Sequence, residues 1–221
     1  MQIVRFRAGS KTRYGALEGS TVVEYAGTPW SVFKRGRHRY ALKQVVPRIF
    51  LKPISAVVGP DDPIVLPPQS TRVEHEAELA VVVKKRCRNV PAERARDYVL
   101  GYTCVNDVTA RDLQARDRGP TRAKAFDTFC PLGPCIATGI EPNAVTVEAF
   151  VNGVVRQSGS TKDFIFPVED LIARISEIMT LLPGDVIATG TPAGVGPLSA
   201  GDRVEIRIDG VGALKNPVVK L

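Results

Sequence analysis

The stretch Val73-Glu74-His75-Glu76-Ala77-Glu78-Leu79-Ala80-Val81-Val82-Val83 constrains the fold most, because it has the composition of a core β-strand and yet carries three acids. Side chains of a strand alternate between its two faces, so Glu74, Glu76 and Glu78 share one face and apolar residues take most of the other. Clustered carboxylates repel one another and resist burial. The pattern therefore predicts a cationic partner, most simply a divalent metal ion.

Composition narrows the class of protein. The chain has 221 residues, 44% of them hydrophobic, with 19 Gly and 17 Pro, which is typical of a turn-rich globular protein with one substantial domain. No apolar run has membrane-spanning length, and Met1–Phe6 lacks the apolar segment of a signal peptide. We expect no membrane association and a cytoplasmic location.

The cysteines do not form a recognisable site. Cys87, Cys104, Cys130 and Cys135 lack Cys-x-x-Cys spacing, and the chain has only two histidines to complete a zinc site. We predict reduced, mostly structural thiols.

Positive charge is concentrated near the N-terminus. Residues 1–52 hold eleven Lys and Arg against two acids, although the net charge of the whole chain is only +7. The run Lys34-Arg35-Gly36-Arg37-His38-Arg39 is a candidate anion or nucleic-acid patch. It lacks the interleaved aromatic residues of single-strand binders, so the favoured interpretation is a solvated basic loop.

Hydrophobic periodicity predicts a mostly β chain with two or three short helices, an α+β class. A small β-rich N-terminal unit is expected over 1–47 and the main domain over 48–221, which includes a turn and edge strand over 57–68 and a hairpin at Val151-Asn152-Gly153-Val154. Further strands are expected at Ile3–Phe6, Thr12–Leu17, Thr21–Tyr25, Tyr102–Thr109, Thr146–Val151, Asp185–Ala188 and Arg203–Ile208, and helices at 91–100 (ended by Gly101), from Ala110 to Arg116, and from Val168 to Leu181.

Glu76, Glu78 and Asp107 are the candidate metal ligands. Two carboxylates at i and i+2 on a strand point the same way, and Asp107 lies where another predicted strand ends. An all-oxygen set of this kind suits Mg²⁺ or Mn²⁺. The alternative is a solvent-facing acidic strand paired with surface Lys or Arg. Glu74 is placed outside the ligand set, either supporting it or at the surface.

Several motifs in order along the chain closely resemble the fumarylacetoacetate hydrolase family. They are Phe50-Leu-Lys52-Pro53, Glu76-Ala-Glu78-Leu, Asp107-Val-Thr-Ala-Arg111-Asp-Leu-Gln114, Lys124-Ala-Phe-Asp127-Thr128 and Thr189-Gly190-Thr191-Pro192-Ala-Gly194-Val-Gly196. The resemblance covers about residues 48–221. It implies a mixed β-sandwich roll, usually homodimeric, with Mg²⁺ or Mn²⁺ held by Glu76, Glu78 and Asp107.

The same resemblance implies roles for other residues. Arg111 and Gln114 would contact substrate, Lys124 would neutralise negative charge that develops during catalysis, and Thr191 with the Gly190 backbone would hold a substrate carboxylate. Taken singly, each has a simpler interpretation: an exposed lysine, an arginine paired on a surface helix, or a glycine-shaped turn. His75 is expected on the opposite strand face, as a supporting or structural residue.

One family feature is missing from the sequence. Members usually carry, before the Phe-Leu-Lys-Pro motif, a lid helix with a Gly-x-Asn-Tyr-x-x-His-like signature and a nearby Glu that activate water. Here Lys43–Arg48 runs straight into Ile49–Pro53, and His38 matches neither the signature nor its position. The segment expected near 47/48 is either deleted or omitted as mobile, and omission is the favoured explanation.

The leading hypothesis is a metal-dependent enzyme that acts on a small 2-oxo or 1,3-dicarbonyl carboxylic acid through an enolate. Hydrolysis of an acylpyruvate, decarboxylation of an oxaloacetate-like acid and isomerisation of a 2-hydroxyhepta-2,4-diene-1,7-dioate all use this chemistry. True absence of the lid favours decarboxylation, which needs no activated water. The alternative is a catalytically impaired protein of the same fold that binds anions or nucleic acid through its basic N-terminal segment.

Overall fold

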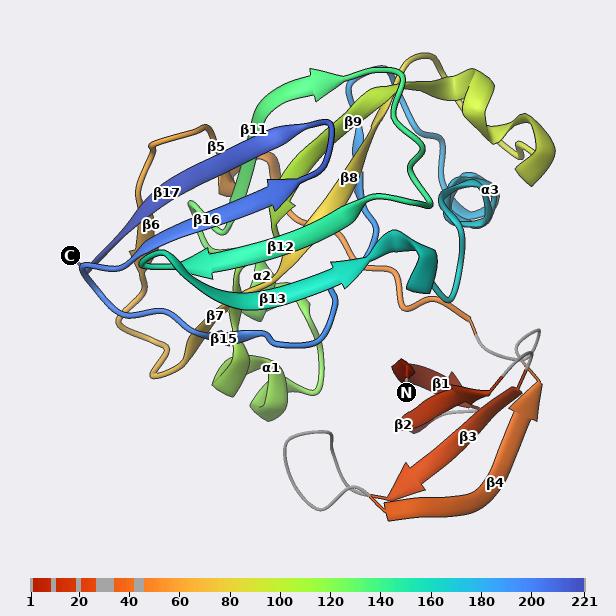
Figure 1. Cartoon of the computed structure of the whole chain (residues 1–221), viewed down its shortest axis with the longest axis horizontal. Helices are drawn as coiled ribbons and strands as arrows, with labels where there is room; N and C mark the ends of the chain where they lie inside the picture. The colour runs from red at the N-terminus through yellow and green to blue at the C-terminus, as the bar shows by residue number, and fades with distance from the viewer. Residues whose placement is uncertain (1, 9–10, 19–20, 27–33, 42–45, 221) are drawn as a thin grey trace. The chain divides into compact units, whose positions relative to one another are not determined.

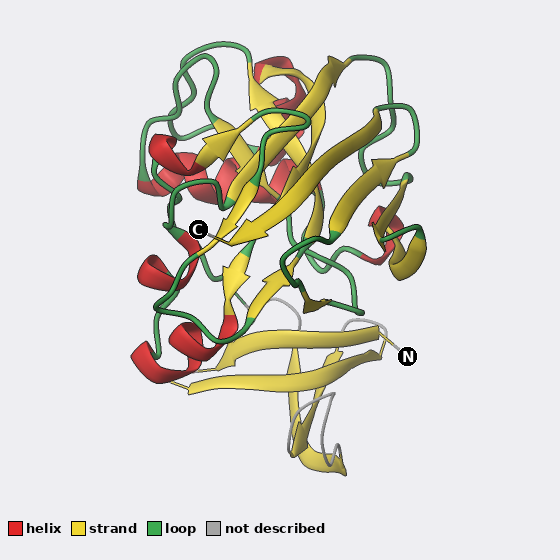
Figure 2. Cartoon of the chain, turned by 90° about the vertical axis from the view of Figure 1, so that its left-hand side faces the viewer, coloured by secondary structure: helices red, strands yellow, loops and turns green. Residues whose placement is uncertain are grey.

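The computed structural model describes residues 2–8, 11–18, 21–26, 34–41 and 46–220. Contacts divide the chain into two units, Met1–Ile49 and Phe50–Leu221. The division lies two residues from the predicted boundary. Strands dominate the described chain and its helices are short, which confirms the predicted mostly β class with short helices (Figure 2).

The first unit is a four-stranded antiparallel sheet in the order β1-β2-β3-β4. Its strands are β1 (Gln2–Ala8), β2 (Lys11–Glu18), β3 (Thr21–Ala26) and β4 (Lys34–Ala41). The first three were predicted. The fourth was not: the basic run is a strand paired with β3, and the expectation of a loop was wrong. A basic strand is tolerated here because β4 is at the edge of the sheet, where one side of its backbone bonds β3 and its arginines stay exposed to solvent. Arg35 also forms an ion pair with Glu18 at 2.8 Å.

The second unit is built on two five-stranded sheets and one three-stranded sheet, ordered β14-β8-β9-β11-β5, β13-β12-β16-β17-β6 and β10-β7-β15 (Figure 1). Its strands are β5 (Val57–Val58), β6 (Ile64–Leu66), β7 (Val73–His75), β8 (Ala77–Val83), β9 (Val99–Asn106), β10 (Thr109–Ala110), β11 (Cys130–Ala137), β12 (Thr146–Val151), β13 (Val154–Ser160), β14 (Val186–Ala188), β15 (Gly196–Pro197), β16 (Arg203–Ile208) and β17 (Gly212–Lys220). Its helices are α1 (Arg111–Asp117), α2 (Thr121–Lys124), α3 (Val168–Ile178) and the 3-10 helices η2 (Ile54–Ala56), η3 (Ala92–Tyr98) and η4 (Thr161–Asp163).

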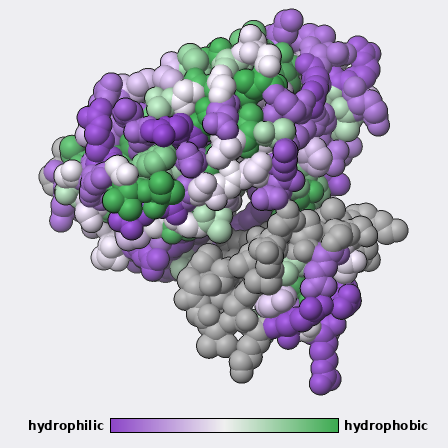
Figure 3. Space-filling model, in the orientation of Figure 1, coloured by the Kyte–Doolittle hydropathy of each residue, from purple (hydrophilic) through white to green (hydrophobic). Residues whose placement is uncertain are grey.

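The two five-stranded sheets pack against each other and enclose the core. Strands β8 and β9 of one sheet contact β12, β16 and β17 of the other. Inward-facing side chains such as Leu79, Ile206 and Leu214 are at most 1% exposed. On the surface of this unit, hydrophilic residues cover much of the face in Figure 3, with hydrophobic patches between them. The unit therefore buries its apolar residues between sheets, as β-sandwiches do.

Local sequence signals account for several elements. The predicted strands Thr146–Val151 and Arg203–Ile208 are β12 and β16. The β12–β13 hairpin turns at Asn152 and Gly153, whose φ angles of 53° and 78° are the positive pair that a type I′ turn requires. Strands β5 and β6 close one end of their sheets, which confirms the predicted edge.

Helix α3 buries Leu171, Ile172 and Ile175 along one stripe and packs on η3. It ends at Ile178, where Met179 becomes extended, so the last predicted turn does not form.

Two expectations for the β8–β9 region were wrong. Residues 73–83 form two strands, β7 and β8, that break at Glu76, and both faces are buried. Gly101 does not end a helix, because η3 stops at Tyr98 and Gly101 lies within β9. There a Cβ would approach the carbonyl oxygen of Ala137 to 2.5 Å, so the glycine serves close strand packing.

The lid segment is absent from this chain. The full sequence joins Pro47 directly to Arg48, which corrects our preference for an omitted mobile segment.

All four cysteines are free thiols, as predicted. No helix among the described residues is long and apolar enough to cross a membrane.

The sandwich core predicts a large stability cost at Ile206, whose strand partners are Ala149 and Leu214. Ile206→Ala should lower the free energy of unfolding by about 2–5 kcal/mol, because it removes buried methyl groups and leaves a cavity. The control Val154→Ala, at a half-exposed hairpin position, should change it by less than about 0.5 kcal/mol. Urea denaturation followed by circular dichroism measures both, and equal effects would contradict the described core.

Candidate functional site: a buried carboxylate cluster

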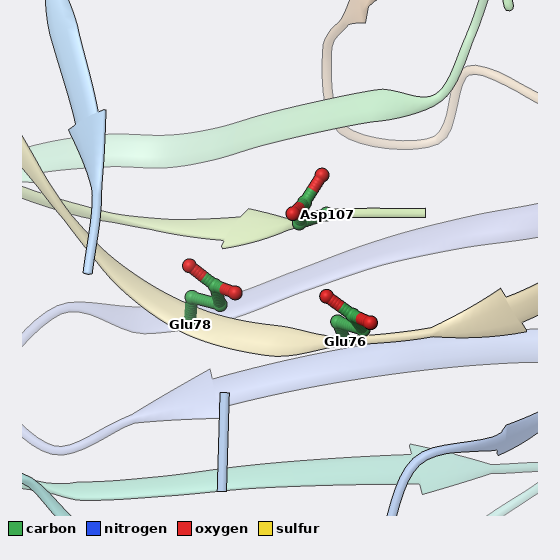
Figure 4. Close-up of side chains that lie close together, drawn as sticks. All are labelled: Glu76, Glu78 and Asp107. Carbon is green, nitrogen blue, oxygen red and sulfur yellow. The ribbon is translucent and has the colours of Figure 1, made fainter. Parts of the chain in front are cut away.

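Glu76, Glu78 and Asp107 come together at one end of the β8–β9 pair. Each offers a carboxylate oxygen within 4.8 Å of the others, and all three side chains are buried. Figure 4 shows the three carboxylates gathered between neighbouring strands. Antiparallel pairing of Ala77 with Asn106 sets this arrangement, and the N–H of Asp107 donates to the carbonyl oxygen of Glu76 at 2.9 Å. The structure thus brings together the three residues that the sequence indicated as ligands.

Two lysines neutralise part of this charge: Lys124, which is buried, and Lys52, whose side chain is 11% exposed. The Lys124 ammonium lies 2.6 Å from Glu76 Oε2 and 2.5 Å from Asp107 Oδ2. The Lys52 ammonium lies 2.7 Å from Asp107 Oδ1 and donates to the carbonyl oxygen of Lys124 at 2.6 Å. Burial alone would lower the pKa of Lys124, but the facing carboxylates outweigh it and raise the pKa above its ordinary value. Lys124 is therefore a charged hydrogen-bond donor and a poor base.

Arg111 is the third cationic side chain that pairs with the buried acids. Its guanidinium contacts Glu74 Oε2 at 2.6 Å and Glu76 Oε1 at 2.5 Å, and donates to Gln114 Oε1 at 2.8 Å. Glu74 is 2% exposed and also pairs with Arg72, so the surface alternative for this acid was wrong. The arrangement holds Arg111 and Gln114 beside the cluster.

Glu78 is the acid whose charge is left uncompensated. Within the described chain its carboxylate has no ion pair, and it accepts one hydrogen bond, from the N–H of Gly190 at 2.7 Å. Burial, together with the charges of Asp107 and Glu76, raises the pKa of Glu78 to about 8. Glu76 differs: burial opposes its ionisation, but Lys124 and Arg111 hold its pKa below the ordinary value.

This donor set fits a divalent cation. Three carboxylate oxygens are the ligands that Mg²⁺ and Mn²⁺ prefer, and such an ion would balance the charge that Glu78 carries once its proton is lost.

The Thr189–Pro192 loop lies against β8. Thr189 Oγ1 donates to the carbonyl oxygen of Leu79 and Thr191 Oγ1 to that of Ala77, both at 2.8 Å. The Gly190 N–H is engaged by Glu78, so both groups expected to hold a substrate carboxylate already have partners within the chain. Binding of a substrate carboxylate by this loop stays a prediction. In the structure, the loop orients Glu78 through the Gly190 N–H.

Sequence reasoning missed three contributors. Lys52 belongs to a motif used for the family resemblance, but no spacing links it to Asp107. Asn106 directly precedes Asp107, and its Oδ1 accepts from the N–H of Glu76 at 2.9 Å. Gln157 lies in β13 and belongs to no motif that could have indicated it from the sequence. Its Oε1 lies 2.9 Å from His75 Nδ1.

His75 has the structural position that was expected of it. It is fully buried, and burial lowers its pKa, so the ring is neutral.

The fold and the carboxylate cluster are those of an enzyme of β-sheet architecture with a site suited to a divalent cation. More particularly, the chain belongs to the fumarylacetoacetate hydrolase family. The model of the C-terminal domain of that family matches residues 27–219, and a model described as Rv2993c-like, N-terminal, matches residues 1–46.

Three similar proteins carry the names of enzymes. The human mitochondrial oxaloacetate tautomerase FAHD2A is 46% identical over 185 residues, which cover 78% of this chain and 59% of that protein. The structure of 5-carboxymethyl-2-hydroxymuconate delta-isomerase from Mycobacterium smegmatis is similar over all of both chains, at 40% identity and a TM-score of 0.78. Fumarylpyruvate hydrolase from Pseudomonas aeruginosa, in complex with Mn²⁺ and pyruvate, matches over 82% of each chain at 33% identity and a TM-score of 0.77.

The raised pKa of Glu78 predicts how stability depends on pH in the metal-free protein. Between pH 4.5 and about 8 the folded chain keeps the Glu78 proton and the unfolded chain releases it, so stability falls as pH rises. The range above pH 6.5 is the informative one, because Glu76 does not titrate there and the small remaining contribution of His75 is common to the wild type and Glu78→Gln. From pH 6.5 to 8 the loss relative to Glu78→Gln should be about 1.5 kcal/mol. Urea titrations with chelator present measure it, and parallel pH curves for the two proteins would contradict the described electrostatics.

Proposed function

We propose that the protein is a Mg²⁺- or Mn²⁺-dependent enzyme that acts on a small 2-oxo or 1,3-dicarbonyl carboxylic acid through an enolate. The reaction class is a proton shift, a tautomerisation or isomerisation, with decarboxylation as the related alternative. The observation that carries the proposal is the buried set Glu76, Glu78 and Asp107, in which Glu78 lacks a cationic partner within the described chain. The names of the tautomerase and isomerase relatives, and the Mn²⁺ and pyruvate of the hydrolase complex, support it.

The residues around the cluster fit this chemistry. A divalent ion held by the three acids would supply positive charge that stabilises an enolate. Lys124, charged and fixed between Glu76 and Asp107, donates a hydrogen bond where negative charge develops. Arg111 is about one-quarter exposed and keeps Gln114 oriented, so this pair can orient an anionic substrate beside the cluster.

The missing lid separates the candidate reactions. In the family the lid carries the His and Glu that activate water, and this sequence joins Pro47 directly to Arg48. Of the two histidines in the chain, His75 is buried against Gln157. A proton shift or a decarboxylation needs no activated water nucleophile, whereas hydrolysis of a C–C bond does.

Removal of a proposed ligand should abolish metal-dependent turnover. Glu78→Ala should lower kcat/KM by about three orders of magnitude, or ~4 kcal/mol of transition-state stabilisation, because one of three oxygen ligands is lost. The control Glu93→Ala changes an exposed acid on η3 and should leave kcat/KM unchanged. Steady-state kinetics with Mg²⁺ and Mn²⁺ measure both, and metal-dependent turnover retained by Glu78→Ala would refute the site.

Substrate preference tests the reaction class. Across oxaloacetate, hydroxy-diene-dioates and acylpyruvates, we expect kcat/KM for enol–keto exchange or isomerisation to exceed that for acylpyruvate hydrolysis at least about tenfold, because the water-activating pair is absent. Absorbance assays of enol decay and pyruvate release separate these activities. Hydrolysis as the fastest reaction would contradict the assignment.

A further inference from the structure

Gln157 is a buried amide whose four contacts all lie around the carboxylate cluster, although it touches none of the three acids. It lies in β13 and is 1% exposed. Its Oε1 accepts from the N–H of Ala77 at 3.0 Å and lies 2.9 Å from His75 Nδ1. Its Nε2 donates to Thr191 Oγ1 at 2.8 Å and to the carbonyl oxygen of Pro192 at 2.9 Å. These contacts use the full hydrogen-bonding capacity of a glutamine side chain.

The contacts also determine the state of His75. Since Oε1 can only accept, the proton of the neutral imidazole is on Nδ1. The lowered pKa of His75, caused by burial, agrees with a neutral ring. Gln157 therefore makes two accepted and two donated bonds, each to a different partner.

Those partners adjoin the proposed ligands on both sides. Ala77 lies between Glu76 and Glu78 in the sequence, so its N–H fixes the backbone from which both carboxylates extend. Thr191 follows Gly190, whose N–H is the one hydrogen-bond donor to Glu78 within the described chain. The loop packs closely on β13, since a Cβ at Gly159 would lie 2.6 Å from Pro192 Cβ. One side chain thus couples the strand break at Glu76 to the loop that orients Glu78.

We propose that Gln157 is a positioning residue of this site: it holds the Thr189–Pro192 loop against the β7–β8 junction and so keeps Glu78 in a cation-binding orientation. The inference rests on the proposed function, because it assumes that Glu78 is a ligand. Loss of the amide removes two of the hydrogen bonds that hold the loop, those to Thr191 and Pro192. The Gly190 N–H is then held less firmly against Glu78, and the carboxylate gains rotational freedom that cation binding must remove.

A purely structural role is the competing explanation, and Asn216 provides a matched control. Asn216 is also a buried amide, 1% exposed, and its Nδ2 donates to the carbonyl oxygens of Gly59 at 2.8 Å and Asp62 at 2.9 Å. Neither acceptor adjoins a proposed ligand. Replacing either amide by leucine leaves buried backbone groups unpaired and should lower Tm. Only the change at Gln157 should also alter cation binding.

The test uses Mn²⁺ as the probe, with the whole chain as wild type, Gln157→Leu, Asn216→Leu and Glu78→Ala. Calorimetric titration gives the Mn²⁺ Kd, electron paramagnetic resonance reports the symmetry of the bound ion, and thermal melts give Tm. We expect Gln157→Leu to raise Kd at least about tenfold and to broaden the resonance, while Asn216→Leu keeps Kd within about twofold of wild type. Gln157→Met, with an unbranched side chain of similar length, is judged by the same criterion should the leucine variant not fold.

The outcomes distinguish the two proposals. Mn²⁺ binding by wild type that disappears in Glu78→Ala but stays within twofold in Gln157→Leu overturns the role of Gln157 alone. A tenfold weakening in Asn216→Leu as well also overturns it, because it shows a general loss of stability. Failure of wild type to bind Mn²⁺, or unchanged binding by Glu78→Ala, overturns the proposed function and the positioning role with it.

Discussion

The burial of negative charge inside a β-sheet unit is the constraint on which the rest of the structure depends. Glu74, Glu76, Glu78 and Asp107 are each less than 10% exposed. A buried carboxylate without a partner costs several kcal/mol, so each must pair with a cation, accept hydrogen bonds or keep its proton. All three are present here: ion pairs for Glu74, Glu76 and Asp107, and for Glu78 a hydrogen bond from the Gly190 N–H together with a raised pKa.

The sheets make this charge cluster rigid. The β8–β9 pairing places Asp107 beside Glu76, and the break between β7 and β8 lets Glu76 lie between two strands instead of within one. The cations come from elsewhere: Lys52 precedes η2 and Lys124 ends α2. Glu78 lies in β8, Glu76 directly precedes β8 and Asp107 directly follows β9. Their spacing is therefore set by backbone hydrogen bonds of and beside the paired strands, including the one from the Asp107 N–H to the Glu76 carbonyl oxygen.

Much of the fold was accessible from local patterns, since period-two alternation marks β12 and β16, positive-φ residues mark the β12–β13 turn, and an apolar stripe marks α3. These patterns did not predict elements whose structure depends on pairing with a strand that is distant in the sequence. The basic strand β4 forms because β3 offers a backbone edge, and Gly101 continues β9 because β11 lies too close for a side chain. Strands β11 and β17 were not anticipated. Strand propensity describes the local conformational preference of a segment and does not say which partner strand lies beside it.

By itself, the sequence determined the residue types and their local spacing: two glutamates at i and i+2, an aspartate at a strand end, and motifs that resemble one family. Tertiary structure alone decided that these acids lie within 4.8 Å of each other, that Lys52 and Lys124 meet Asp107, and that Gln157 reaches the junction from β13. The reason is physical. The pKa order of the acids depends on burial and on distances between charges, and those distances join segments tens of residues apart that only folding brings together.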